Sequence, residues 1–460
     1  MLDCFAGKAD ARTATITPIE TSKFRAWLKK QPKRRTEWIE ANGFKADAGS
    51  VLLLPGGKSN DALDGALLGV RDATDIWSWA AAAGRLPKGR YALDAATKDD
   101  TAARAALGWA LGCYRYDRYS KSDKPAPKLV LSKAMRAGGA EREASAIYLV
   151  RDLINTPSSD MGPGELAAAA QALAREFKGK CSTIIGDDLL LQNYPMVHAV
   201  GRASTRAPRL IDMTWGKARN PKVTLVGKGV CFDTGGLDLK GASGMLLMKK
   251  DMGGAAHVLG LARMIMMADL PVRLRVLVPA VENSVSGDAF RPLDVLPSRD
   301  GKTVEIGNTD AEGRLILADA LTEALSEEPA LLLDFATLTG AARVALGPEL
   351  PAMFCNDDKL ATDLKKAGET ENDPVWHMPL WRPYRRFLDS NIADINNTSS
   401  VPQGGAVTAA VFLHEFVGDD VPWAHFDIYG WNASERPGRQ KGGEAMALRA
   451  AFRVIADRFT

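Results

Sequence analysis

The sequence is poor in the two residues that most often bind zinc. Its five histidines show no HExxH or HxH spacing, which argues against a histidine-based zinc site. Its five cysteines lie far apart along the chain and form no CxxC pair. We therefore expect free thiols in a reducing compartment, and the cytoplasm is the expected location.

The sequence also lacks a long hydrophobic run and a strong charge imbalance. No window approaches the ~18 apolar residues of a membrane span, and the N-terminal "MLDCFAGKADARTATITPIE" lacks the apolar core of a signal peptide. A net charge of +3 is too small to argue for nucleic acid or a membrane as a partner. One basic cluster, "WLKKQPKRRTEW" (27–38), is interpreted as a solvated helix face, with DNA binding as the alternative.

The apolar pattern predicts an α/β fold. Helices are expected at 163–178, 252–268, 314–327 and 404–417, and strands at 222–230, 271–281, 330–338 and 424–430. Continuous apolar strands that alternate with helices indicate a sheet covered on both faces. We predict a smaller N-terminal α/β domain (1–135), a connecting helix (136–157) and a C-terminal α/β/α sandwich with a mixed sheet (158–460). The polar, proline-rich 121–128 is expected to be a loop.

Three glycine-containing segments carry charges where the apolar pattern should continue. They are "VGKGVCFDTGGLDLKG" (226–241), "MKKDMGGAAHVLG" (248–260) and "GNTDAEGRLILADAL" (307–321). All three lie at predicted element boundaries, which in a doubly wound sheet can converge on one edge. The acidic residues of this set are Asp233, Asp251, Asp310 and Glu312.

These four carboxylates carry four negative charges, which two divalent cations would neutralise in a dry pocket. Lys228 would then either pair with the carboxylates or lose its proton and act as an amine ligand. Each residue also has an ordinary interpretation. Asp251 and Asp310 can be helix-start residues, Glu312 a partner of the helix dipole, and Lys228 and Lys240 surface lysines. The residues by themselves leave both interpretations open.

Five motifs closely resemble the leucine aminopeptidase family of dinuclear metallopeptidases, and they come in that family's order. They are "RDLINTPSSDMGP" (151–163), "VGKGVCFDTGG" (226–236), "MKKDMGGAA" (248–256), "NTDAEGRL" (308–315) and "DFATLTGA" (334–341). The resemblance covers residues 145–430, whereas residues 1–130 show no motif of this family.

The resemblance implies a site with two divalent ions per subunit, Zn²⁺ or Mn²⁺. One ion, the readily exchanged one, would be bound by Lys228, Asp233, Asp251 and Glu312. The other would be bound by Asp233, Asp310, Glu312 and the backbone carbonyl of Asp310. Lys240 and Arg314 would be catalytic, with a bicarbonate at Arg314 as general base. Substrate contacts would come from Met248, Asp251, Thr337, Leu338 and Gly340.

The implied function is that of a metal-dependent aminopeptidase. It would release N-terminal residues from peptides with a free N-terminus, through attack of a metal-bridging hydroxide on the first peptide bond. A homohexamer is expected by the same resemblance. The alternatives are a DNA-binding regulator, a dipeptidase of cysteinylglycine type, and a catalytically dead homologue, against which the intact Lys240 and Arg314 argue.

Three positions depart from the family pattern. Gly241 stands where proline is common, Leu293 stands where glycine is usual, and 396–405 ("NNTSSVPQGG") replaces a loop near the substrate entrance. They leave the implied ligands intact and leave the preferred N-terminal residue open.

Overall fold

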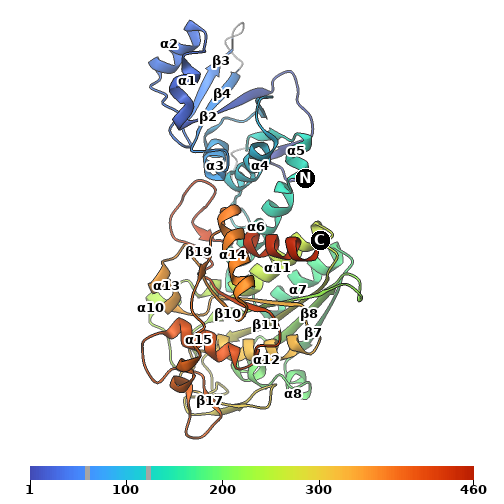
Figure 1. Cartoon of the computed structure of the whole chain (residues 1–460). Helices are drawn as coiled ribbons and strands as arrows, with labels where there is room; N and C mark the ends of the chain where they lie inside the picture. The colour runs from blue at the N-terminus through green and yellow to red at the C-terminus, as the bar shows by residue number, and fades with distance from the viewer. Residues whose placement is uncertain (57–62, 121–125) are drawn as a thin grey trace. The chain divides into compact units, whose positions relative to one another are not determined.

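The computed structural model of the chain describes residues 1–56, 63–120 and 126–460 (Figure 1). They form two compact units, Met1–Tyr148 with Ala433–Lys441, and Leu149–Asn432 with Gly442–Thr460. The division falls inside helix α6 (Ala140–Asn155), which lies within the connecting helix predicted over 136–157. Most of the loop expected at 121–128 lies outside the described residues. The return of Ala433–Lys441 to the first unit was not predicted, and the sequence-based domain limits stay predictions.

The first unit is built on a six-stranded sheet in the order β1-β6-β5-β2-β4-β3, parallel throughout except between β3 and β4. Its strands are β1 (Phe5–Ala6), β2 (Ala14–Glu20), β3 (Val51–Pro55), β4 (Leu63–Val70), β5 (Arg90–Leu93) and β6 (Lys128–Val130). Its helices are α1 (Phe24–Leu28), α2 (Lys33–Ala41), α3 (Ile76–Arg85), α4 (Asp99–Cys113) and α5 (Lys133–Ala137). Helices α3 and α4 pack closely because Gly108 lacks a side chain. A Cβ there would lie 2.1 Å from the Ile76 carbonyl oxygen.

The second unit is built on a nine-stranded mixed sheet in the order β16-β15-β18-β14-β9-β11-β8-β7, with β10 paired to β11. The central strands β18, β14, β9 and β11 are parallel, and antiparallel strands flank them on both sides. The strands are β7 (Lys180–Ile185), β8 (Arg209–Trp215), β9 (Lys222–Gly227), β10 (Gly229–Asp233), β11 (Arg273–Asn283), β14 (Leu331–Ala336), β15 (Ala352–Cys355), β16 (Trp376–His377) and β18 (Trp423–Asp427).

Helices cover both faces of this sheet (Figure 1). One layer holds α7 (Pro163–Glu176), α11 (Gly253–Met267), α14 (Asp358–Thr370) and α16 (Leu448–Phe459), and the other holds α9 (Pro195–Gly201), α12 (Gly313–Leu325) and α15 (Gly405–His414). Successive residues of β9 face opposite layers. Val226 belongs to the core cluster that includes α12, whereas a Cβ on Gly227 would lie 2.7 Å from the Gly254 carbonyl oxygen of α11. The predicted α/β/α sandwich with a mixed sheet is confirmed.

Shorter elements complete the second unit. A small sheet joins β12 (Val295–Pro297), β13 (Thr303–Glu305) and β17 (Ile395–Asn396), and a ribbon joins β19 (Trp431–Asn432) and β20 (Gly442–Gly443). The short helices are α8 (Asp188–Leu191), α10 (Ala242–Met245) and α13 (Gly340–Leu346), and the 3-10 turns are η2 (Ser158–Asp160), η3 (Met248–Met252) and η4 (Arg382–Leu388). No helix in the described part of the chain is long and apolar enough to cross a membrane.

The prediction of one continuous strand over 222–230 is wrong, because the strand breaks at Lys228. The carbonyl oxygen of Lys228 accepts a hydrogen bond from the Ala255 N–H near the start of α11, at 2.8 Å. This bond to a helix takes the place of a hydrogen bond to a neighbouring strand. The chain resumes as β10, which pairs with β11 and ends at Asp233. The break therefore places Lys228 and Asp233 at the carboxyl ends of β9 and β10, respectively.

Candidate active site

The four predicted acidic residues come together at the carboxyl ends of the central strands. Asp233 is the last residue of β10, Asp251 lies in η3 before α11, and Asp310 and Glu312 precede α12. Segments far apart in the sequence thus meet at one end of the sheet, as their place at predicted element boundaries suggested.

Three of these carboxylates crowd one another. Oxygens of Asp233, Asp310 and Glu312 lie within 4.8 Å of each other. Asp233 and Glu312 are buried and Asp310 is partly exposed, so water screens their repulsion poorly. The Oε2 atom of Glu312 is buried and has no hydrogen-bond partner among the residues that the structure describes. Such an arrangement needs protons or cations to be stable.

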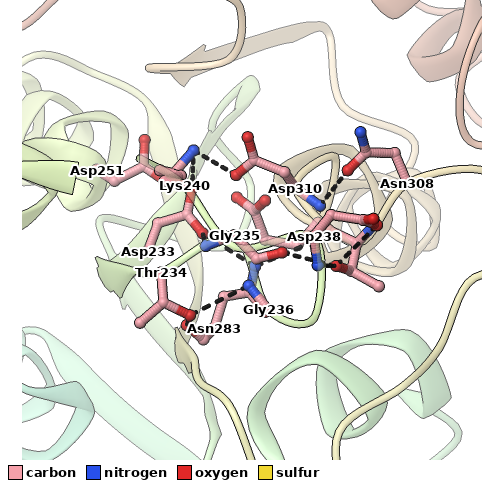
Figure 2. A network of polar contacts seen from close by, with 12 residues as sticks. Asp233, Thr234, Gly235, Gly236, Asp238, Lys240, Asp251, Asn283, Asn308 and Asp310 are labelled. Atoms are coloured by element: carbon pink, nitrogen blue, oxygen red, sulfur yellow. Dashed lines mark hydrogen bonds and ion pairs between the residues drawn. The ribbon is translucent and has the colours of Figure 1, made fainter. Parts of the chain in front are cut away.

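Two lysine ammonium groups supply part of that positive charge. The Nζ of Lys228 lies 2.7 Å from Asp251 Oδ2 and 3.0 Å from Glu312 Oε1. The Nζ of Lys240 lies 2.9 Å from Asp233 Oδ2 and also pairs with Asp310 (Figure 2). Each lysine therefore bridges two acidic side chains that come from different loops.

The pKa values of the cluster record an excess of negative charge. Burial, together with the charge of Asp233, raises the pKa of Glu312 to about 7 and that of Asp310 to about 6. Burial favours the neutral form of Lys228, but the carboxylates of Asp251 and Glu312 outweigh it and raise the pKa of this lysine. Carboxylate oxygens, an amine and an unpartnered buried oxygen are a donor set that fits divalent cations.

A buried scaffold that the sequence did not reveal fixes Asp233. The Asn283 side chain, at the end of β11, donates from Nδ2 to Asp233 Oδ1 at 2.9 Å and to the Thr309 carbonyl oxygen at 3.1 Å. The Gly235 N–H donates to the same Asp233 oxygen at 2.8 Å. Asn283 is the second of two polar residues that directly follow the predicted strand 271–281. This position at the end of a strand was the one sequence feature that could have indicated a role in the site.

The predicted substrate-contact loop, 337–340, is held from two sides. Thr337 Oγ1 donates to Asp251 Oδ1 at 2.6 Å. On the other side, Asp427 accepts hydrogen bonds from the Leu338 N–H at 3.0 Å, the Thr339 N–H at 3.1 Å and the Thr339 hydroxyl at 2.6 Å. Asp427 was not predicted, although an acidic residue inside the apolar strand 424–430 was a signal.

Arg314 is the second residue of α12 and is 9% exposed. Its Nη1 donates to the Asn397 carbonyl oxygen at 2.7 Å, and its buried Nε has no hydrogen-bond partner in the described part of the chain. Asn397 is buried and also accepts from the Gly307 N–H at 2.8 Å. The loop 396–405, which departs from the family pattern, therefore supports both Arg314 and the turn that carries Asp310.

A cavity of about 650 Å³ opens beside the cluster. Of the predicted residues, it is lined by Lys228, Asp233, Lys240, Met248, Asp251, Asp310, Thr337, Leu338 and Gly340. Its wall also includes Lys250, Arg343, Tyr429 and Met446, which the sequence did not single out. The cavity is large enough for a small ligand such as a short peptide.

Comparisons with known proteins agree with this site. Residues 148–452 match the model of the cytosol aminopeptidase family, catalytic domain, and residues 14–132 match the model of the M17 aminopeptidase N-terminal domain. A probable cytosol aminopeptidase of Roseiflexus castenholzii is 41% identical, over 78% of this chain and 77% of that protein. Another, of Syntrophotalea carbinolica, is 43% identical, over 76% of this chain and 73% of that protein.

Solved structures are similar over nearly the whole chain. The crystal structure of a cytosol aminopeptidase from Coxiella burnetii has a TM-score of 0.96 and 49% identity, and all of both chains is covered. The bottromycin maturation enzyme BotP in complex with Mn has a TM-score of 0.89 and 32% identity, over 98% of this chain and all of that one.

Fold, acidic cluster and matches together define the class as metal-dependent aminopeptidases. The chain belongs to the cytosol aminopeptidase family and is a peptide hydrolase of the leucyl aminopeptidase type. The second match shows that residues 14–132, almost all of which lie in the stretch where we found no family motif, also resemble a domain of this family.

Proposed function

We propose that the chain removes N-terminal residues from peptides with two divalent cations held in the acidic cluster. The observation that carries this proposal is the crowding of three carboxylates within 4.8 Å beside a cavity of about 650 Å³. The proposed ligands of the exchangeable ion are Lys228, Asp233, Asp251 and Glu312, and those of the other ion are Asp233, Asp310 and Glu312, with the Asp310 carbonyl. When bound, the two ions supply an activated water and polarise the scissile carbonyl.

Lys240 is proposed to stabilise charge that develops on the substrate. Its side chain lines the cavity and is only 16% exposed, so a hydrogen bond from its ammonium to the carbonyl oxygen would act in a low dielectric. Its present partners are the carboxylates of Asp233 and Asp310. Cations on these carboxylates would take over that role and leave the ammonium available to the substrate.

Asp251 is proposed to receive the free amine of the substrate. It lines the cavity, and its Oδ1 is oriented by the Thr337 hydroxyl. Peptides with a blocked N-terminus could not make this contact, which accounts for exopeptidase action. Met248, Thr337, Leu338 and Gly340 would contact the N-terminal residue from the cavity wall.

Arg314 is proposed to hold a bicarbonate that acts as general base. Its place at the start of α12 favours an anion, because helix N-terminal N–H groups point outward. The Nε atom of Arg314, which has no hydrogen-bond partner, offers a further donor.

Metal identity, assembly and location rest on the family. The BotP complex supports Mn²⁺, and Zn²⁺ is the alternative. We infer a homohexamer in the cytoplasm. The DNA-binding alternative receives little support, since α2 exposes Lys33 and Arg34 and buries Ile39, as a solvated helix does.

The test is hydrolysis of aminoacyl-p-nitroanilides before chelation, after chelation, and after readdition of Mn²⁺ or Zn²⁺. We expect activity to disappear with the metal and to return with one of the ions, while the N-acetylated substrate stays intact. Cysteinylglycine in the same series tests the dipeptidase alternative. Undiminished hydrolysis by protein that holds less than one ion per subunit contradicts the proposal.

A further inference from the structure

Two cationic side chains of the cavity wall have no acidic partner among the described residues. Lys250, in η3, lines the cavity and is 5% exposed. Arg343, in α13, lines the same cavity and is exposed. The Lys250 Nζ lies 5.1 Å from the centroid of the Tyr429 ring, and the Arg343 Cζ lies 5.0 Å from it. Among the residues that the structure describes, neither cation forms an ion pair.

The acidic side chains nearby are already engaged. The Asp251 carboxylate pairs with Lys228 and accepts the Thr337 hydroxyl. Asp427 accepts three hydrogen bonds from Leu338 and Thr339. The neighbouring Lys249 differs, because its ammonium donates to the Asn155 carbonyl oxygen at 2.6 Å and it is not among the cavity-lining residues.

A buried ammonium without an anion is unfavourable, and an aromatic ring compensates only part of the lost hydration. Lys250 and Arg343 therefore form a site prepared for an anion. A carboxylate matches it best, because a guanidinium binds carboxylates in a bidentate manner and an ammonium adds a charge-assisted hydrogen bond.

We propose that Lys250, Arg343 and Tyr429 form a carboxylate-binding subsite of the cavity. The chain would then favour peptides that place a carboxylate next to the amine-binding Asp251, which follows Lys250 directly in the sequence. This inference rests on the proposed aminopeptidase function. The carboxylate comes either from an acidic N-terminal side chain or from the C-terminus of a dipeptide, and the chemistry of recognition is the same.

The experiment uses substrate pairs that differ only in the carboxylate. Glutamyl- and glutaminyl-p-nitroanilide test the side chain, and leucylglycine and leucylglycinamide test the C-terminus. For each pair the ratio of kcat/KM values is measured for the metal-loaded wild type, Lys250→Met and Arg343→Gln. Lys249→Met is the matched control, because it removes an adjacent ammonium that is not among the cavity-lining residues.

We expect the wild type to favour the carboxylate member of one pair. Lys250→Met and Arg343→Gln should each lower that ratio about tenfold or more, the effect of losing a charge-assisted hydrogen bond. The pair that responds identifies the source of the carboxylate. Ratios near one in the wild type, or ratios unaffected in both variants, overturn the subsite.

A binding measurement separates this inference from the proposed function. If the wild type hydrolyses no substrate with any ion, the proposed function fails. Calorimetric titration with glutamate and with glutamine then decides the subsite alone. Tighter binding of glutamate that Arg343→Gln abolishes supports the subsite, and equal affinities overturn it. Arg343 is exposed, so this variant keeps the test valid even if Lys250→Met does not fold.

Discussion

Gly313 leaves room for the Lys228 side chain to reach the acidic cluster. The substitution Gly313→Ala should therefore displace Lys228, a proposed metal ligand, while all the proposed ligand residues are kept. Gly313 is the first residue of α12, between Glu312 and Arg314. A Cβ at this position would lie 2.5 Å from Lys228 Cε and 2.7 Å from its Nζ, whereas ordinary contacts are 3.4–4 Å. The end of the lysine must therefore move by about 1 Å, and α12 itself tolerates alanine well.

The displacement should weaken the metal site more than the fold. Lys228 Nζ would lose its place 2.7 Å from Asp251 and 3.0 Å from Glu312, and with it the position from which we propose that it binds an ion. Errors of about 1 Å in a catalytic site can lower the rate about 100-fold. We expect a loss of that order in kcat/KM, and an affinity for the exchangeable ion that falls about tenfold or more.

The assay is a titration of activity and bound metal against free Mn²⁺ or Zn²⁺, with a thermal melt of each protein. Gly287→Ala is the control, because nothing lies within 4 Å of a Cβ at Gly287. Wild-type metal affinity and turnover in Gly313→Ala would refute the role given to Lys228. A large loss of melting temperature in this variant would show that the lysine end cannot give way.

The remaining predictions concern single side chains. Asp310→Ala should abolish hydrolysis while the thermal melt stays cooperative, and full activity in that variant would overturn the metal site. Lys240→Ala should lower kcat far more than metal content, whereas equal losses would assign Lys240 a structural role. Burial lowers the pKa of His257 to about 4 from 6.5, so the native state binds this proton less readily than the unfolded chain. The resulting stability is complete above pH 6.5 and is lost as pH falls through 4, by about 3 kcal/mol. Chemical denaturation between pH 8 and 4 of the wild type and His257→Leu checks this. As pH falls from 8 to 4, the wild type should lose unfolding free energy relative to His257→Leu. A difference between the two proteins that does not change with pH would contradict this prediction.

Local sequence patterns predicted the helices and central strands that surround the site in the second unit. The helices expected at 163–178, 252–268 and 314–327 begin within one residue of α7, α11 and α12, because apolar periodicity and turn glycines are local signals. The order of the strands in the sheet was not predictable in this way. Neighbours such as β9 and β14 are separated by about a hundred residues, and their pairing depends on the packing of the helices between them.

The scaffold of the site was missed for the same reason. Asn283 is 50 residues from Asp233, to which it donates a hydrogen bond. Asp427 is 89 residues from Leu338, whose N–H donates a hydrogen bond to it. No spacing rule connects such pairs. The departure at Leu293 has a visible consequence, since its φ of +70° lies in the left-handed region that favours the glycine usual there.

The sequence by itself determined which charged residues stand at the element boundaries: four acidic residues, two lysines and an arginine, in motifs that resemble those of a metallopeptidase family. Only the tertiary structure decided how the charges are shared. It showed which lysine bridges which pair of carboxylates. It also showed that Lys250 and Arg343 have no carboxylate partner in the part of the chain that the structure describes. The physical reason is that charge and apolar period are properties of residues, whereas electrostatic balance depends on distances that exist only after the sheet edge has assembled.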